Sequence, residues 1–321
     1  MESPMHLRRP RPTSVALATL ALPAALALTA CGGSEETATD AGGGATVTIE
    51  TARGPVEVPQ DPERVLTFDI GVLDTIDTLG GEVAGVPEFA LPDYLSAYDD
   101  APIIGSLFEP DFEAVAEIDP DLIIVTGRSL EAMPDLEELA PTIDLSVDES
   151  DYLGSVERNV RSLAAVLGEE DAAEQALADL EAEVEETRAA GAEAGTGLIV
   201  MTSAGEVSAY GAGSRFGLVH DALGVEPAVD IDSATHGEPV SFEFVAEADP
   251  DWLFVVDRDV AIGETSGESA EQVLDNALVA RTTAWSQDQV VQLDPLAWYI
   301  VSGGLTATRT MVSDVADGIA S

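Results

Sequence analysis

The sequence predicts an α/β fold with two α/β lobes, each built on a mainly parallel sheet, and one long α-helix that bridges them. Three observations support this prediction: strands and helices alternate along both halves, a 17-residue segment occurs twice, and an alanine-rich helical stretch separates the halves. The alternation is typical of a parallel sheet, because parallel strands need long crossover connections that are usually helical. The duplication indicates two similar lobes.

The repeated segment is FEAVAEIDPDLIIVTGR at residues 112–128, and it recurs as FEFVAEADPDWLFVVDR at residues 242–258. Ten of the 17 positions are identical at a constant offset of 130 residues. Each copy predicts a short helix, an Asp-Pro-Asp turn, a buried strand and then an arginine. Because ligands bind beyond the carboxyl ends of strands in open parallel sheets, we expect Arg128 and Arg258 to face a shared cleft.

The N-terminal half shows four strand patterns and three helical ones. The predicted strands are 64–68, 83–86, 121–125 and 142–145, and the predicted helices are 69–79, 151–167 and 169–190. The last of these helices would be about 30 Å long at ~1.5 Å per residue, which makes it the predicted linking rod.

The C-terminal half repeats the alternation. Its predicted strands are 197–201, 207–210, 252–256 and 289–293, and its predicted helices are 216–223 and 304–319. The predicted division of the chain is a signal peptide at 1–30, a flexible tether at 31–45, an N-terminal lobe at 46–168, a linking helix at 169–191 and a C-terminal lobe at 192–321.

The first thirty residues have the pattern of an export signal. A basic segment with Arg8, Arg9 and Arg11 precedes an apolar run at 15–27 that is too short for a convincing membrane span. The sequence Leu-Thr-Ala-Cys that ends at Cys31 resembles the lipobox of bacterial lipoproteins. Because Cys31 is the only cysteine of the chain, we expect it to be lipidated and expect no disulfide.

The charge is strongly negative: 13 basic and 61 acidic residues give a net charge of −48. All 13 basic residues are arginines. Such a surface repels nucleic acid and anionic lipid, which excludes both as partners. An anionic ligand could bind only where several arginines converge, since charges are screened over ~8–10 Å at moderate salt.

A third arginine, Arg215, lies in the turn Gly-Ala-Gly-Ser-Arg-Phe-Gly at 211–217, after a predicted strand. The turn departs from the dinucleotide-binding pattern at Phe216, and from the hydrolase nucleophile elbow around Ser214 at Ala212 and Phe216. Guanidinium groups suit anions because they are always charged and donate in a planar fork. Each arginine alone could pair with a nearby carboxylate, but three arginines after strands favour a ligand site.

Four motifs give the whole chain a resemblance to the substrate-binding lipoproteins of siderophore ABC importers, from the lipobox to the C-terminus. They are Asp-Pro-Asp-Leu-Ile-Ile at 119–124, Gly-Ser-Arg-Phe-Gly at 213–217, Asp-Pro-Asp at 249–251 with Asp257-Arg258, and 294–304 from Asp-Pro through Trp298-Tyr299 to Ser-Gly-Gly. The resemblance implies two lobes bridged by one helix, and a monomeric, non-enzymatic receptor without a cofactor that delivers a ferric siderophore to a permease.

Within that family the chain is most similar to the branch that binds ferric catecholates. The resemblance implies that Arg128, Arg215 and Arg258 surround the anionic iron complex. It also implies that His236 and Tyr299 bind the iron when the siderophore has only four donor atoms. Ferric iron is a hard ion that accepts phenolate oxygen, with imidazole as a workable second ligand.

The resemblance also implies how the protein is held and where it delivers its ligand. One surface glutamate per lobe docks on the permease in such proteins, and Glu113 and Glu243 are equivalent in the two repeats. Glu117 and Glu247 are the second choice, and an ordinary solvated helix face is the alternative. Lipidated Cys31 would anchor the protein outside the cytoplasm on the cell membrane.

Other functions remain open from the sequence. Another iron chelate, such as haem, a corrinoid or a hydroxamate complex, could be the ligand, although a neutral hydroxamate would not need three arginines. A surface hydrolase would need a nucleophile and a base, and beyond residue 30 the chain has two histidines, His220 and His236. An adhesive lipoprotein is the remaining alternative.

Overall fold

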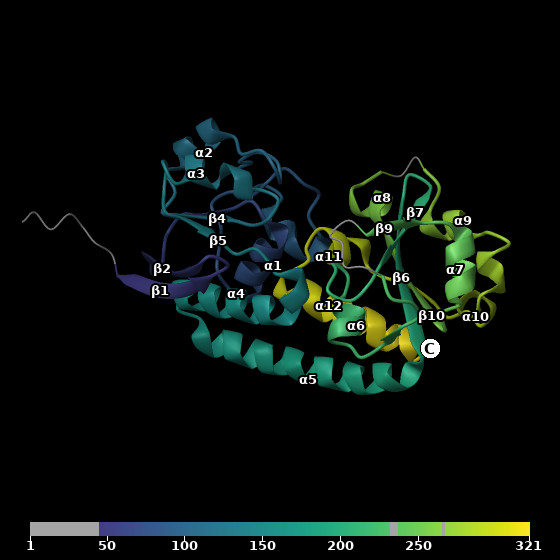
Figure 1. Cartoon of the computed structure of the whole chain (residues 1–321). Helices are drawn as coiled ribbons and strands as arrows, with labels where there is room; N and C mark the ends of the chain where they lie inside the picture. The colour runs from purple at the N-terminus through teal and green to yellow at the C-terminus, as the bar shows by residue number, and fades with distance from the viewer. Residues whose placement is uncertain (1–44, 232–236, 265–266) are drawn as a thin grey trace, which may run out of the picture. The chain divides into compact units, whose positions relative to one another are not determined.

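The computed structural model describes residues 45–231, 237–264 and 267–321, and these residues belong to one compact unit. We call residues 45–167 the N-terminal lobe (Figure 1). Its strands are β1 (Thr46–Thr51), β2 (Gly54–Pro59), β3 (Val65–Thr67), β4 (Leu122–Val125) and β5 (Thr142–Asp144). Its helices, with η for 3-10 helices, are α1 (Ile70–Thr78), η1 (Asp93–Tyr98), α2 (Phe112–Ile118), η2 (Leu130–Ala132), α3 (Met133–Leu136), η3 (Glu149–Asp151) and α4 (Tyr152–Leu167).

The sheet of the N-terminal lobe has the order β3-β4-β5 and is parallel throughout. All four residues of the central strand β4 are buried, which explains why its sequence is apolar at every position. The predicted strand at 83–86 forms isolated bridges instead, between Gly85 and Leu66 and between Val86 and Ile103. A separate antiparallel hairpin, β1–β2, packs against α4.

We call residues 195–321, as far as they are described, the C-terminal lobe. Its strands are β6 (Thr196–Ser203), β7 (Glu206–Tyr210), β8 (Glu226–Pro227), β9 (Glu238–Val240), β10 (Trp252–Asp257) and β11 (Val290–Gln292). Its helices are α6 (Leu218–Asp221), α7 (Phe242–Ala248), α8 (Arg258–Ala261), α9 (Ala270–Leu274), η4 (Val279–Arg281), α10 (Thr283–Ser286), α11 (Pro295–Tyr299) and α12 (Leu305–Ile319). None of the helices in the described ranges is long and apolar enough to cross a bilayer.

The predicted fold class is confirmed, with a mixed sheet in the C-terminal lobe. Its strand order is β11-β10-β6-β7-β9, and β10 pairs in parallel with both β6 and β11. Strand β7 is antiparallel to its neighbours β6 and β9. The cause is a tight turn between β6 and β7, where Ala204 and Gly205 both have positive φ (50° and 80°), as two-residue hairpins require.

Helix α5 (Glu170–Ala194) links the two lobes and is about 37 Å long at ~1.5 Å per residue. Its buried residues recur every three or four positions, at Ala173, Leu177, Leu180, Val184, Thr187 and Gly191. This face packs against α4 and α12. The helix continues past its predicted end at Gly191, because this glycine is buried against the carbonyl oxygen of Leu223 and serves close packing.

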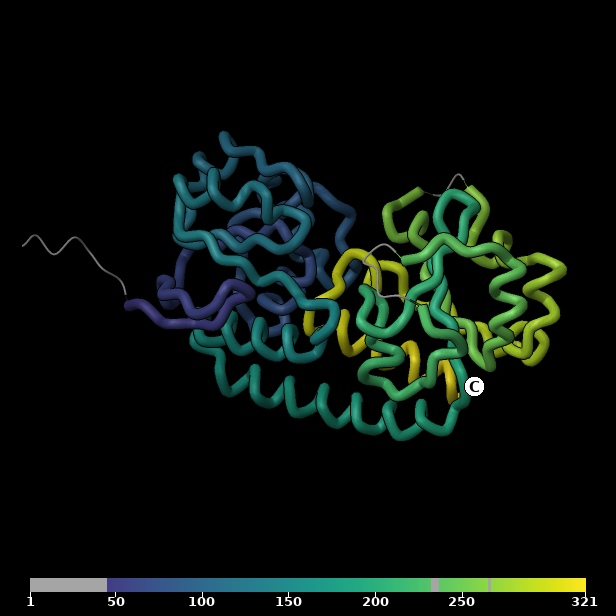
Figure 2. The backbone as a smooth tube through the Cα atoms, viewed as in Figure 1, coloured from purple at the N-terminus to yellow at the C-terminus, as the bar shows by residue number. Residues whose placement is uncertain are grey.

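The C-terminal helix α12 connects the lobes a second time. It packs on α5 and on α1, and in Figure 2 the yellow C-terminal segment lies between the blue and green parts of the tube. The side chain of Asp74 in α1 accepts hydrogen bonds from the backbone N–H groups of Thr306 (3.3 Å) and Ala307 (2.9 Å), in the first turn of α12. The lobes are therefore joined by packing as well as by α5.

The two sequence repeats have the same local structure. Helices α2 and α7 both end at an aspartate in the left-handed conformation, Asp119 (φ 55°) and Asp249 (φ 41°). Two residues later, the carboxylates of Asp121 and Asp251 accept backbone N–H groups at the start of the neighbouring strand, at 2.9 and 2.8 Å. Each Asp-Pro-Asp turn therefore fixes the strand that leads to the arginine.

Candidate ligand-binding site

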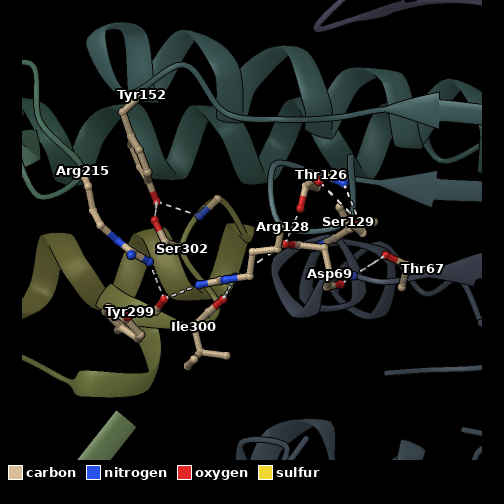
Figure 3. A network of polar contacts seen from close by, with 12 residues as sticks. Thr67, Asp69, Thr126, Arg128, Ser129, Tyr152, Arg215, Tyr299, Ile300 and Ser302 are labelled. Carbon is tan, nitrogen blue, oxygen red and sulfur yellow. Dashed lines mark hydrogen bonds and ion pairs between the residues drawn. The ribbon is translucent and has the colours of Figure 1, made fainter. Parts of the chain in front are cut away.

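Arg128 lies in the loop that follows β4, in the N-terminal lobe. Its Nη2 donates a hydrogen bond to the carbonyl oxygen of Tyr299 at 2.6 Å, and its Nη1 donates to that of Ile300 at 3.1 Å (Figure 3). Both acceptors lie at the end of α11. One side chain of the N-terminal lobe therefore contacts the C-terminal part of the chain.

Asp69 supports the loop that contains Arg128. It is the N-cap of α1, with Oδ1 accepting the N–H of Val72 at 2.9 Å. Its Oδ2 accepts the hydroxyl of Thr126 at 2.7 Å and lies 3.9 Å from Nη1 of Arg128. This buried carboxylate therefore orients the loop and the guanidinium without forming a close ion pair.

Arg215 lies in the glycine-rich turn at 211–217, in the C-terminal lobe. Its Nη2 donates to the same carbonyl oxygen of Tyr299 at 2.7 Å, and its guanidinium carbon lies 4.2 Å from the centre of the Tyr299 ring. Burial, and then the nearby charge of Arg128, lowers the pKa of Arg215. Arginine titrates so far above neutral pH that the group stays charged.

Arg258 begins α8, directly after β10, and Asp257 caps this helix. Its Nε donates to the hydroxyl oxygen of Tyr299 at 2.8 Å, and its Nη1 donates to Oγ of Ser203 at 3.3 Å. The structure therefore brings the three arginines selected from the sequence to one residue. Two of them contact the carbonyl of Tyr299, and the third contacts its hydroxyl.

A cleft of about 770 Å³ lies beside this cluster and contains residues of both lobes. Arg128, Arg215 and Tyr299 line it, while Arg258 reaches the hydroxyl end of the Tyr299 ring. Carboxylates also face the cleft, and apolar groups complete its wall. These residues include Asp69, Glu109, Glu131 and Glu149, and Val72, Phe108, Leu145, Val147 and Leu163.

The acceptors that Arg128 and Arg215 use at Tyr299 are neutral backbone oxygens. The charge of an anion adds a direct Coulomb attraction to the guanidinium that a neutral carbonyl oxygen does not provide, and this attraction is stronger in a partly buried site than in water. An anionic ligand can therefore replace the carbonyl of Tyr299 as the acceptor. Arginines from both lobes can therefore bind one negatively charged ligand at the same time.

Tyr152, from α4, forms part of the same cleft and holds the segment before α12 (Figure 3). Its hydroxyl accepts the N–H of Gly303 at 2.9 Å and the hydroxyl of Ser302 at 3.4 Å, and it lies 3.1 Å from Oγ1 of Thr308. Burial raises the pKa of Tyr152, so its hydroxyl stays protonated. The tyrosine therefore acts as a neutral anchor between α4 and α12.

The two glutamates predicted to dock on a permease occupy equivalent exposed positions. Glu113 is in the first turn of α2 and Glu243 is in the first turn of α7. The second-choice residues, Glu117 and Glu247, are exposed as well. The structure does not separate the two pairs by exposure.

Two predicted residues, Cys31 and His236, lie outside the described residues, so their roles stay predictions. His220, which the sequence assigned no function, has Nδ1 at 2.9 Å from the carbonyl oxygen of Val225, and burial lowers its pKa. Within residues 45–231, 237–264 and 267–321, no group of three or more His, Cys, Asp and Glu side chains is arranged to hold a metal ion.

Two residues of the site, Asp69 and Tyr152, were not predicted from the sequence. Asp69 follows the predicted strand at 64–68, so the rule that selected Arg128 could also have selected it. Tyr152 had no comparable signal, because it opens a helix and its partners are about 150 residues away.

The fold and the cleft are those of a two-lobed ligand-binding protein. The sequence model of the periplasmic binding protein family matches residues 67–297. This match covers more than half of the chain, and the chain belongs to this family.

Several relatives are similar along most of the chain. The petrobactin-binding protein YclQ of Bacillus subtilis is 40% identical over 280 residues, which cover 85% of this chain and 88% of YclQ. The crystal structure of YclQ matches with a TM-score of 0.83 at 38% identity, over 86% of this chain and 99% of that one. Both comparisons therefore extend over nearly the whole of YclQ.

Two further crystal structures are similar. A TroA-like periplasmic binding protein from Xylanimonas cellulosilytica is 48% identical, with a TM-score of 0.78 over 86% of this chain and 99% of that chain. The catecholate-siderophore binding protein VctP from Vibrio cholerae is 35% identical, with a TM-score of 0.80 over 84% and 99%. These relatives are binding proteins, which agrees with the expectation of a receptor.

Proposed function

We propose that this protein is an extracytoplasmic receptor that captures a ferric siderophore, of the catecholate type, and delivers it to an ABC permease. The observation that carries the proposal is the convergence of Arg128, Arg215 and Arg258, from both lobes, on Tyr299. In a ferric catecholate the negative charge of the oxygens exceeds the positive charge of the iron, so three guanidinium groups suit it. Similarity to proteins named for binding petrobactin and catecholate siderophores supports this ligand class.

Binding proceeds by exchange of hydrogen-bond acceptors. Oxygen atoms of the chelate replace the carbonyl of Tyr299 as the acceptor for Arg128 and Arg215, while Asp69 keeps the loop of Arg128 in position. The volume of the cleft, about 770 Å³, is in the range of roughly 300–1,000 Å³ that is usual for small-molecule sites.

The iron is part of the cargo. With a siderophore that supplies four donor atoms, the phenolate oxygen of Tyr299, whose hydroxyl proton passes to solvent, and the imidazole of His236 fill the two remaining positions of the iron. A hard ferric ion accepts both kinds of donor. With a siderophore that supplies six donors, these two residues do not reach the metal.

Delivery requires a docking surface and an anchor. Glu113 and Glu243 are proposed to contact arginines of the permease, one from each lobe, and their exposed and equivalent positions support this. Lipidated Cys31 is proposed to hold the protein on the cell membrane outside the cytoplasm, where the receptor acts as a monomer.

Replacing the arginines tests the proposal. We expect Arg128→Ala, Arg215→Ala and Arg258→Ala each to weaken ferric catecholate binding by about tenfold or more, ~1.4 kcal/mol per factor of ten. Each substitution removes a cation from a partly buried cluster. Titration of tryptophan fluorescence measures the affinity, because Trp298 adjoins Tyr299.

Arg161→Ala is the matched control, since Arg161 lies exposed on α4 and pairs with Glu157 and Glu174. Affinity unchanged in all three cleft variants would remove the proposal. Equal losses with a net-neutral ferric hydroxamate would show that the cluster recognises a feature other than anionic charge.

A further inference from the structure

Phe108 is the most exposed of the large hydrophobic side chains within the described ranges, with 61% of its surface accessible. It also lines the cleft, together with its neighbour Glu109. Single exposed hydrophobic side chains are common on protein surfaces, and what distinguishes Phe108 is its place at the cleft, where a bound ligand can bury its ring. The neighbouring residue Leu107 is buried in the core, and anchors the segment in its place.

The loop around Phe108 is fixed without help from the phenyl ring. The N–H of Ser106 donates to the carbonyl of Glu109 at 2.9 Å, and Oγ of Ser106 accepts the N–H groups of Phe108 (3.2 Å) and Glu109 (2.9 Å). Gly105 has a φ of 117°, and a Cβ there would collide with the backbone of residues 109–111. The backbone of Phe108 is therefore held at the cleft by these contacts, and most of the surface of its ring is accessible to a ligand.

The arginines recognise negative charge, but they do not distinguish one anionic iron chelate from another. A citrate complex of iron is anionic and has no aromatic ring, whereas a catecholate complex presents flat rings on its outside. A phenyl ring at the cleft adds contacts that only the second kind of ligand can use fully, since aromatic pairs gain energy beyond their buried area. In this arrangement the arginines respond to the charge of the ligand, and Phe108 responds to its aromatic rings.

We infer that Phe108 is a specificity-determining residue that packs against an aromatic ring of the bound chelate and selects aryl-oxygen siderophores over aliphatic anionic ones. This inference rests on the proposed function and names the ligand class of the same site. Phe108 is not expected to contribute to the stability of the fold.

The test uses two substitutions of Phe108, with a ferric tris-catecholate chelator as the aromatic probe and ferric citrate as the aliphatic one. Phe108→Leu keeps an apolar side chain and removes the ring, and we expect about a fivefold weaker affinity for the catecholate complex. Phe108→Trp keeps a ring, and its affinity should stay within about twofold of the native protein. The inhibition constant of ferric citrate in competition should not change in either variant.

Phe112→Leu is the control, because Phe112 is also exposed (40%) and does not line this cleft. Equal catecholate affinities for Phe108→Leu, Phe108→Trp and the native protein would overturn the inference and leave the proposed function intact. The same holds if Phe108→Leu weakens the catecholate and citrate complexes to the same extent. A native protein that fails to bind the catecholate probe would overturn the proposed function and the inference together. Melting temperatures of the variants confirm that each is folded.

Discussion

The backbone and the side chain of Tyr299 have different partners, and one substitution separates them. The carbonyl oxygen accepts hydrogen bonds from Arg128 and Arg215, while the hydroxyl accepts one from Arg258. Phenylalanine at this position keeps the carbonyl and the ring and removes only the hydroxyl. The substitution therefore isolates the contribution of the phenol oxygen.

We expect Tyr299→Phe to weaken a four-donor ferric catecholate by about tenfold and a six-donor complex by no more than about threefold. Only the four-donor complex leaves positions on iron that the phenol oxygen can occupy. The native protein should shift the visible charge-transfer band of the four-donor complex on mixing, and the variant, which keeps only His236 as an iron ligand, should shift it less. A shift that is the same in both proteins contradicts a bond between Tyr299 and iron.

Individual site residues differ in how far the sequence could reveal them. Arg128 and Arg258 were found because each follows a strand of the repeat, and Arg215 because it follows another strand. Asp69 follows a strand too, but the chain has 61 acidic residues, and nothing else in the sequence distinguishes Asp69 from the others. The carbonyl of Tyr299 has no signal at all, because every residue has a backbone oxygen.

At the scale of elements, α12 depends on another helix for its cap. Its N-cap residue, Gly304, has no side chain, and Asp74 of α1 accepts two N–H groups of the first turn instead. Unpaired N–H groups and the helix dipole favour a negative group there. Burial nevertheless dominates and raises the pKa of Asp74 to about 6, against the lowering effect of these hydrogen bonds.

The raised pKa predicts how stability depends on pH. The pKa of Asp74 in the folded protein, about 6, exceeds the ordinary value of 3.8. The contribution of protonated Asp74 to the free energy of unfolding is therefore fully present below pH 3.8 and is lost as pH rises through 6. Relative to Asp74→Asn, the native protein should lose on the order of 3 kcal/mol of unfolding free energy between these limits. Urea unfolding of both proteins from pH 4 to 7.5 measures the difference, and a constant difference contradicts the prediction.

The elements with a strong pattern could be predicted from the sequence, and those fixed by local or distant contacts could not. Strands β4 and β10 are apolar runs after Asp-Pro-Asp turns, and α5 has a clear helical period. The hairpin β1–β2 was not predicted, because few of its residues are buried. The antiparallel direction of β7 follows from a two-residue turn that the alternation of strands and helices does not show.

At the scale of the whole molecule, charge is distributed very unevenly. The net charge of −48 repels an anion at long range, while the cluster at Tyr299 attracts it at short range. Exposed carboxylates on the two repeats, such as Glu113 and Glu243, can attract a basic partner. The proposed permease contacts use this surface.

The double variant Glu113→Lys with Glu243→Lys should bind a ferric catecholate within about twofold of the native affinity. Its uptake of labelled iron into cells that contain the permease should fall by about tenfold or more, because like charges would meet at both contacts. Glu117→Lys with Glu247→Lys is the matched control. If uptake is lost in this control but kept in the Glu113→Lys, Glu243→Lys variant, then Glu117 and Glu247 are the docking residues.

Because two guanidinium groups already share the backbone oxygen of Tyr299, the proposed ligand would have to displace the protein's own main chain from them. The affinity that a titration reports is the difference between two sets of contacts and is smaller than the new set alone. On release, the same oxygen takes back both arginines, which lowers the energy needed to give up the cargo.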